Sequence, residues 1–130
     1  MNAIANEYDE KIGTVKIADE VIAVCAVSAT LSTAGVAALS PVFSDNFSKS
    51  IFGKDSLHKG IKISQNDDGI AIDIHIIVDY GVKIPAVAWD VQENVKKEIE
   101  EMTDSQVKAV NIHVQGVRMK DEEDAGDEQD

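Results

Sequence analysis

Residues 70–102 read IAIDIHIIVDYGVKIPAVAWDVQENVKKEIEEM, and this stretch decides the fold. Up to Tyr80 apolar residues occupy every second position, which is the period of a strand with one buried face. From Ile84 onward they recur at the spacing of an amphipathic helix, and Pro85 suits its first turn. Gly81 separates the two halves. The stretch therefore predicts a long strand that leads directly into a long helix.

Strands are also predicted on both sides of this unit. Residues 66–69 read NDDG, a strong turn signal, and the alternating residues 60–65 before them predict a strand that forms a hairpin with the long one. Residues 107–119 predict a last strand, in which the apolar alternation changes phase at Gly116. A β-bulge at Gln115 and Gly116 accounts for this change.

The first half of the chain predicts shorter elements. Residues 11–17 are a strand candidate, and residues 19 to about 33 predict a helix that Gly35 ends. Residues 36–39 predict a second short strand. Between it and the hairpin, large apolar residues recur every four positions and predict a short helix: Phe43, Phe47 and Ile51.

These elements follow the order β-α-β, a short helix, then β-β-α-β. We expect an α+β fold, a two-layer sandwich in which a small, mostly antiparallel β-sheet carries two main helices on one face. The chain has 130 residues, which favours one domain. We place this domain at residues 11–119, after a flexible lead over 1–10 and before a disordered acidic tail over 120–130.

The charge of the chain excludes two classes of partner. The formal net charge is −12, from 24 acids and 12 bases. Seven of the acids fall in residues 121–130, so the first 120 residues carry 17 acids and 12 bases, a net charge of −5. The average field repels nucleic acid and anionic membrane surfaces. We therefore expect a protein partner and no nucleic acid.

Several features of the sequence favour the cytoplasm. Cys25 is the single cysteine, so no intrachain disulfide can form. Residues 1–10 lack the basic and apolar regions of a signal peptide. The most apolar stretch, residues 21–27, is far shorter than the roughly 18 residues that a membrane-spanning helix needs. We expect no direct membrane insertion.

No catalytic or cofactor motif is present. The serines form no GxSxG elbow, and the glycines form neither GxGxxG nor a P-loop. His75 and His113 fall on wet faces of predicted strands near Asp73 and Asp79, but they lack the HxH or HExxH spacing of a zinc site. Cys25 is expected to be buried and unreactive. We therefore expect no metal, no cofactor and no enzymatic activity.

The helix predicted over residues 19–33 is apolar on all sides. One face carries small and branched residues: Ile22, Cys25, Ala26 and Ala29. The opposite side carries Val24, Val27 and Leu31. A single sheet covers one face of a helix, so something else covers the second. The loop that follows is one candidate, and a second subunit of a homo-oligomer, in contact with Val24, Val27 and Leu31, is the other.

Trp89 is a feature that the core of the second predicted helix does not require. It lies about 140° from the apolar line of that helix, so we expect it to be at least partly exposed. Tryptophan is strongly enriched at interaction hot spots, which makes Trp89 a candidate anchor for a protein partner. The alternative is an isolated exposed aromatic residue without a role in binding.

Several short motifs follow one another in the order of a known family. They are VDYG at 78–81, VQENV at 91–95, EMT at 101–103 and VNIHVQGV at 110–117. The N-terminal half adds Gly13, VKI at 15–17, EVI at 20–22 and GV at 35–36. By these motifs the chain is similar to the alkaline shock protein family, also called the Gls-type or envelope stress response family of Gram-positive bacteria.

Two positions depart from the family pattern. Thr103, Asp104 and Ser105 stand where the family often has Thr-Gly-Leu, so the corner after the second helix loses its glycine. Trp89 stands at a position that is usually polar. Neither change touches the predicted core, so the expected fold is the same.

The resemblance implies a protein without enzymatic activity or cofactor, linked to cell-envelope homeostasis and to alkaline or general stress. Some family members sit beneath the membrane through a membrane-anchored partner, and some self-associate. We expect a scaffold or adaptor of the envelope stress response, cytoplasmic and held near the membrane by its protein partner. The alternative is a regulatory binding partner of an enzyme of lipid or acyl metabolism, because other branches of the family are tied to that chemistry.

Overall fold

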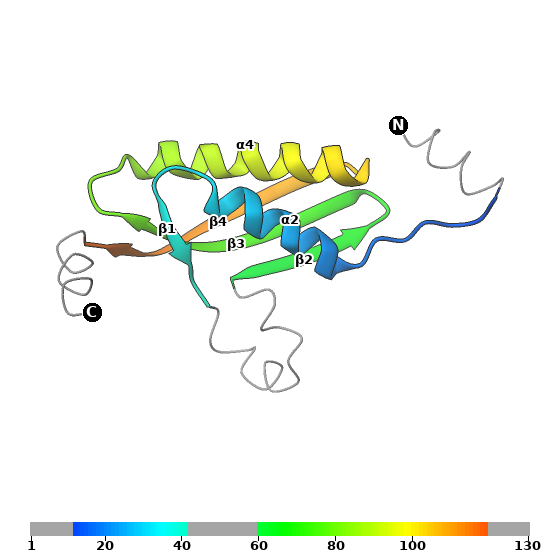
Figure 1. Cartoon of the computed structure of the whole chain (residues 1–130), viewed down its shortest axis with the longest axis horizontal. Coiled ribbons are helices and arrows are strands. Elements are labelled where there is room, and N and C mark those ends of the chain that lie inside the picture. The colour runs from blue at the N-terminus through cyan, green and yellow to red at the C-terminus, as the bar shows by residue number, and fades with distance from the viewer. Residues whose placement is uncertain (1–11, 42–59, 120–130) are drawn as a thin grey trace.

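A computed structural model describes residues 12–41 and 60–119, and these form a two-layer α+β sandwich (Figure 1). Two helices, α2 (Asp19–Leu31) and α4 (Ile84–Thr103), lie side by side on one face of a four-stranded sheet. In the described part of the chain, no helix covers the other face. The fold class expected from the sequence is confirmed.

The long strand β3 (Gly69–Asp79) is the centre of the sheet and of the core. Every second side chain is fully buried toward the helices: Ile70, Ile72, Ile74, Ile76 and Val78. Helix α4 packs its own buried row onto them: Val87, Val91, Val95 and Ile99. The strand and helix predicted from residues 70–102 are thus confirmed, and their two apolar faces make most of the core.

Strand β2 (Ile61–Asn66) pairs with β3 as the predicted antiparallel hairpin, in which Asn66 lies opposite Gly69. The backbone N–H of Asp68 donates to Oδ1 of Asn66 at 2.9 Å, which stabilises the turn locally. Gly69 has a φ of +137° there, and a Cβ would lie 2.7 Å from the carbonyl oxygen of Gln106. A glycine is therefore required where the turn passes the start of the last strand.

Strand β1 (Val36–Leu39) lies end to end with β2 along the same edge of β3. The N–H of Ser40 donates to the carbonyl of His75 at 2.8 Å, and the N–H of His75 donates to the carbonyl of Gly60 at 2.7 Å. The gap between β1 and β2 thus lies opposite a single residue of β3, His75. The short helix predicted from Phe43, Phe47 and Ile51 lies outside the described residues.

Strand β4 (Val107–Arg118) pairs with β3 in parallel, along the edge opposite β1 and β2. The long helix α4 connects the two parallel strands, as such a crossover requires. Ile76 lies opposite Val114 and Ile77 lies opposite Gly116, so Gln115 is the extra residue. The predicted β-bulge is confirmed, and the sheet is mostly antiparallel with one parallel pair.

The strand predicted at residues 11–17 is wrong for the described residues of that segment, because none of them is in a strand. Val15 is 77% exposed. Ile17 packs against the core, and its carbonyl accepts a hydrogen bond from Nε2 of Gln65 at 3.0 Å. Both edges of β3 are already occupied, so this segment has no free place beside the central strand.

After α2 the chain turns at the expected glycine, whereas after α4 it turns at an aspartate. Helix α2 ends at Leu31, two residues before the predicted end, and Gly35 with a φ of +97° then turns the chain into β1. After α4, Asp104 takes the left-handed conformation, with a φ of +60°. Asp tolerates this conformation better than most residues, so the corner forms without the family's glycine.

Candidate interaction surfaces

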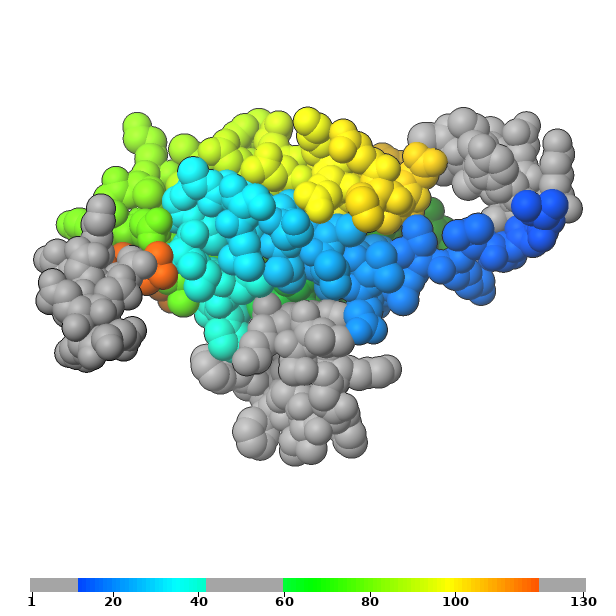
Figure 2. Space-filling view, in the orientation of Figure 1, coloured from blue at the N-terminus to red at the C-terminus, as the bar shows by residue number. Residues whose placement is uncertain are grey.

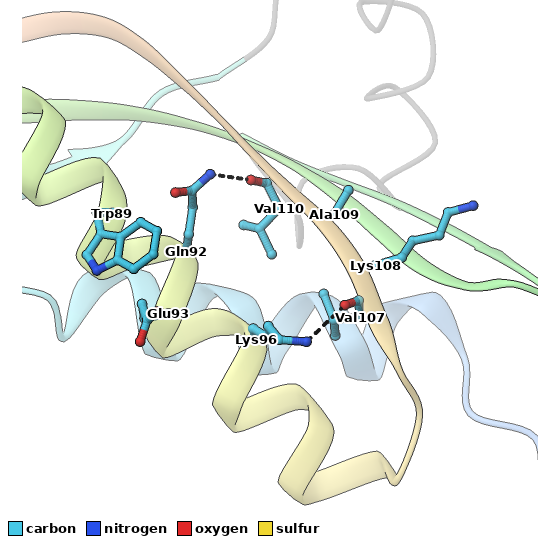
Figure 3. A pocket seen from close by; sticks show the side chains of 8 residues that line it. All are labelled: Trp89, Gln92, Glu93, Lys96, Val107, Lys108, Ala109 and Val110. Atoms are coloured by element: carbon cyan, nitrogen blue, oxygen red, sulfur yellow. Dashed lines mark hydrogen bonds between the residues drawn. The ribbon is translucent and has the colours of Figure 1, made fainter. Parts of the chain in front are cut away.

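A shallow groove of about 300 Å³ lies between α4 and the outer edge of β4 (Figure 3). Its wall on the helix side carries Trp89, Gln92, Glu93 and Lys96, and its wall on the strand side carries Val107, Lys108, Ala109 and Val110. The groove combines an aromatic ring, aliphatic side chains and two amines.

Three side chains of α4 make hydrogen bonds to the outer edge of β4, and we call Gln92, Lys96 and Glu100 the capping stripe. Nε2 of Gln92 donates to the carbonyl of Val110 at 2.9 Å, and Nζ of Lys96 donates to the carbonyl of Val107 at 3.2 Å. The N–H of Val107 donates to Oε2 of Glu100 at 2.9 Å. These side chains replace a neighbouring strand along this part of the edge.

The carboxylate of Glu100 is stabilised in its charged form by this arrangement. Nζ of Lys96 donates to Oε2 of Glu100 at 2.8 Å, one helical turn away. This hydrogen bond, together with the one from the N–H of Val107, lowers the pKa of Glu100 below its ordinary value. The groove therefore keeps a fixed negative charge beside the amine of Lys96 at neutral pH.

Trp89 stands at one end of the groove, one turn before Gln92 (Figure 3). Its side chain is 60% exposed, so the exposure expected from the helical wheel is confirmed. Its role as an interface anchor stays a prediction. Sequence reasoning found Trp89 but missed the groove, whose signal was the spacing of Gln92, Lys96 and Glu100 by four residues on one side of α4.

The outer side of α2 is a second surface, and we call Val21, Val24 and Leu31 the α2 face. Val24 is 58% exposed and Leu31 is 50% exposed. Val27, which the sequence places with them, is half-buried and packs against the core. In Figure 2 the blue α2 region faces the viewer, directly below the green and yellow α4. Trp89 lies on the other helix, so the candidate interaction residues form two surfaces.

Neither of the two explanations offered for the apolar α2 face is tested, and a second subunit in contact with it stays a prediction. The loop that follows falls largely in residues 42–59, outside the described part of the chain, so its covering role stays a prediction. The inward side of the helix agrees with expectation, because Ile22, Cys25 and Ala29 are buried. Burial raises the pKa of the Cys25 thiol, which disfavours the reactive thiolate.

The uncovered face of the sheet carries a polar cluster across β3 and β4. The rings of His75 and His113 stack with their centroids 4.5 Å apart. Oδ1 of Asp73 lies 3.2 Å from Nε2 of His113 and accepts a hydrogen bond from Nδ2 of Asn111 at 3.1 Å. Desolvation by burial acts to raise the pKa of Asp73, but these hydrogen bonds outweigh it and lower the pKa.

This cluster brings together two histidines that sequence reasoning could place only on separate strands. Among residues 12–41 and 60–119, no group of three or more His, Cys, Asp or Glu side chains is arranged to hold a metal ion. Asp79, the other acid considered, is paired with Arg118 at 3.3 Å instead. No helix in the same ranges is long and apolar enough to cross a membrane.

The comparison with known proteins addresses the family directly. A model of the alkaline shock protein 23 family, described as having a cell envelope-related function, matches residues 7–119. The uncharacterised protein YqhY of Bacillus subtilis strain 168 is 40% identical over 110 residues, which cover 85% of this chain and 81% of YqhY. The uncharacterised protein YloU of the same strain is 36% identical over 87% of this chain and 95% of YloU.

A more distant relative carries a functional name. The stress response regulator gls24 homolog of Streptococcus pyogenes serotype M3 is 24% identical over 83 residues, which cover 64% of this chain and 46% of that protein. The family match, the YqhY identity and the α+β fold agree with the motifs at residues 78–81, 91–95 and 110–117. The chain belongs to the alkaline shock protein 23 family, whose function is related to the cell envelope.

Proposed function

We propose that this protein is a non-enzymatic scaffold or adaptor of the envelope stress response, which acts through contacts with other proteins. The observation that carries the proposal is the α2 face, where the apolar residues Val21, Val24 and Leu31 are exposed on a helix whose inward side is buried in the core. The family's relation to the cell envelope supports a partner that is anchored in the membrane.

The composition around the α2 face favours a protein over a lipid surface. The chain has no charged residue from Val21 to Ser44. Helices that lie on membranes carry Lys and Arg on their polar flanks, whereas the first turn of α2 carries Asp19 and Glu20. Exposed aliphatic residues without flanking cations fit the apolar core of a protein–protein interface. The protein would then reach the membrane through its partner.

Cell fractionation with matched variants tests this proposal. Val24→Gln with Leu31→Gln makes the α2 face polar, and because both side chains are already half exposed, the fold should be retained. Asp90→Asn with Glu101→Gln alters two exposed positions of α4 and serves as the control. We expect the wild type and the control in the membrane fraction of native cells, and the α2 double variant in the soluble fraction.

Two further outcomes decide the kind of partner. Purified protein should not bind protein-free vesicles made from lipids of the same membrane, because the partner is a protein. Binding to such vesicles, or equal membrane recovery of the α2 double variant, contradicts the proposal. Capture of a soluble enzyme of lipid or acyl metabolism by the wild type, lost in the α2 double variant, would favour the regulatory alternative instead.

A further inference from the structure

The backbone of β4 alternates between two directions, and the bonds at its ends give the phase. The carbonyls of Gln106 and Arg118 accept hydrogen bonds from β3, from the N–H groups of Ile70 and Tyr80. Val107 and Val110 instead bond to the capping stripe on the outer side, and the extra residue Lys108 between them shifts the alternation by one. Every second residue of a strand directs its backbone N–H and C=O to the same side. Counting forward from Val110 and back from Arg118, the remaining residues whose backbone points outward are Ile112, Val114 and Val117.

We call the outward backbone of Ile112, Val114 and Val117 the free edge. The hydrogen bonds from the capping stripe reach along β4 only as far as Val110, and among the described residues no side chain bonds to the free edge. Natural edge strands are usually protected by charged residues, above all lysine. Residues 109–117 read AVNIHVQGV and contain no Asp, Glu, Lys or Arg, although 28% of the chain is charged.

We propose that the free edge of β4 pairs with the free edge of a second copy of this chain, antiparallel and about a two-fold axis. Two sheets would then continue into one across the dimer, as strand addition does in other complexes. The inference goes beyond the proposed function, because it adds a pairing of two copies through a surface that is separate from the α2 face.

The alternation also determines the register of this pairing. Outward residues must lie opposite outward residues to exchange backbone hydrogen bonds. Ile112 opposite Ile112 would place Val114 against Val110, which Gln92 already occupies, so Ile112 of one copy lies opposite Val114 of the other, and the two-fold axis repeats this pair. His113 then faces His113 of the second copy, in a position where the two Cα atoms approach to about 4.5 Å.

Charge and shape explain why the occupant is a second copy. An edge that pairs with itself places identical side chains close together, and residues 109–117 avoid like charges in a chain of net charge −12. Lys96 and Lys108 give the groove two amines, and their positive charge attracts the seven acids in residues 121–130 of a second copy. Trp89, at the end of the groove, borders the arriving strand and buries apolar surface against it.

Sedimentation of purified protein with matched variants tests the pairing. Val114 is 36% exposed, and Val114→Lys places a lysine on the free edge, the natural protection against strand addition. Val21→Lys is the control, because it makes the same kind of change at an exposed apolar residue of α2, the helix that packs over β1 and β2 at the other edge of the sheet. We expect the wild type and the control to dimerise, and Val114→Lys to raise the dimer dissociation constant about tenfold or more.

A cysteine at the two-fold axis tests the register. His113→Cys should form a disulfide between two copies on mild oxidation, because the Cα separation expected there is within reach of the bond. Ser64→Cys, exposed on β2 at the opposite edge of the sheet, is the control and should remain monomeric on a non-reducing gel. Cys25 is buried and is kept in both variants.

The outcomes separate this inference from the proposed function. A wild type that is strictly monomeric at high micromolar concentration overturns the inference, and so does a dimer that Val114→Lys leaves intact. Disulfide formation at Ser64→Cys in place of His113→Cys overturns the register. Membrane recovery depends on the α2 face, so its loss in the α2 double variant supports the scaffold proposal whatever the sedimentation of Val114→Lys shows.

Discussion

Replacing a glycine by alanine should cost different amounts of stability at Gly35 and at Gly81. Their φ angles are +97° and +95°, so an alanine at either position is strained by about 1–3 kcal/mol. A Cβ at Gly35 would lie 2.6 Å from Cγ2 of Val87, a core residue, whereas a Cβ at Gly81 meets nothing within 4 Å. We expect Gly35→Ala to lower the free energy of unfolding by about 1–3 kcal/mol more than Gly81→Ala.

Urea unfolding of the two variants measures this difference, and Gly81→Ala is the control for backbone strain alone. Equal losses in the two variants would contradict the prediction and would mean that Val87 moves aside at little cost. The comparison separates strain from overlap, which a single glycine substitution cannot do.

The carboxylate of Glu100 predicts that the stability of the protein depends on pH. Its pKa is lowered from the ordinary value of 4.5 by the hydrogen bonds from Lys96 and from the N–H of Val107. A lowered pKa in the folded state contributes stability above the unfolded pKa, and this contribution is lost as the pH falls through the folded pKa. Because the side chain is one-third exposed, we expect a contribution of about 0.5–1 kcal/mol at neutral pH.

Glu100→Gln should therefore be less stable than the wild type at pH 7, and the difference should shrink as the pH falls below about 4.5. Thermal unfolding across this range, with Glu101→Gln as the exposed control, provides the measurement. A difference that stays constant with pH would show that the carboxylate charge contributes nothing.

At the scale of elements, α4 holds β4 through side chains that act on its backbone. Gln92 bonds to the carbonyl of Val110, whereas its neighbour Glu93 lines the groove and makes no hydrogen bond to the described part of β4. We expect Gln92→Ala to lower the free energy of unfolding by about 1 kcal/mol and Glu93→Ala to change it by less than about 0.5 kcal/mol. Chemical denaturation of both variants decides this, and equal losses would mean that water replaces Gln92 fully.

The elements also show why part of the fold could be predicted from the sequence. The unit at residues 70–102 is long and strongly periodic, and the phase change at Gly116 marks a bulge by itself. Residues 11–17 contain the same alternation over a shorter length, but the edges of β3 were occupied by strands far away in the sequence. The pairing of β3 with β4, and hence the groove, depends on contacts that local periodicity does not contain.

Across the whole molecule, the two candidate surfaces lie over opposite edges of the sheet. Helix α2 packs over β1 and β2, whereas α4 packs over β4 and borders the groove (Figure 1). A dimer through the free edge of β4 would therefore leave both α2 faces available for partners. Two binding faces on one dimer would raise the apparent affinity for a partner confined to a membrane, without any new contact.

The acidic C-terminal residues of two copies repel each other, but they are also attracted to the lysines of the groove. A variant with a neutral tail shows which of the two effects is larger. Replacement of the seven acids in residues 121–130 by Asn and Gln keeps the length and reduces the net charge from −12 to −5. If the tails only repel, the dimer becomes tighter. If their attraction to Lys96 and Lys108 of the other copy is larger, the neutral tail makes the dimer several-fold weaker at low salt, which is the result we expect.

The same effect should disappear at high salt, because the screening length falls from about 10 Å at 0.1 M to about 3 Å at 1 M ionic strength. Sedimentation of the wild type and the neutral-tail variant at both salt concentrations gives the four dissociation constants. Lys62→Gln removes a lysine from β2, at the opposite edge of the sheet, and should leave the salt dependence of the wild type unchanged. A neutral tail that tightens the dimer at low salt contradicts the attraction to Lys96 and Lys108, because removing a net attraction cannot strengthen the association.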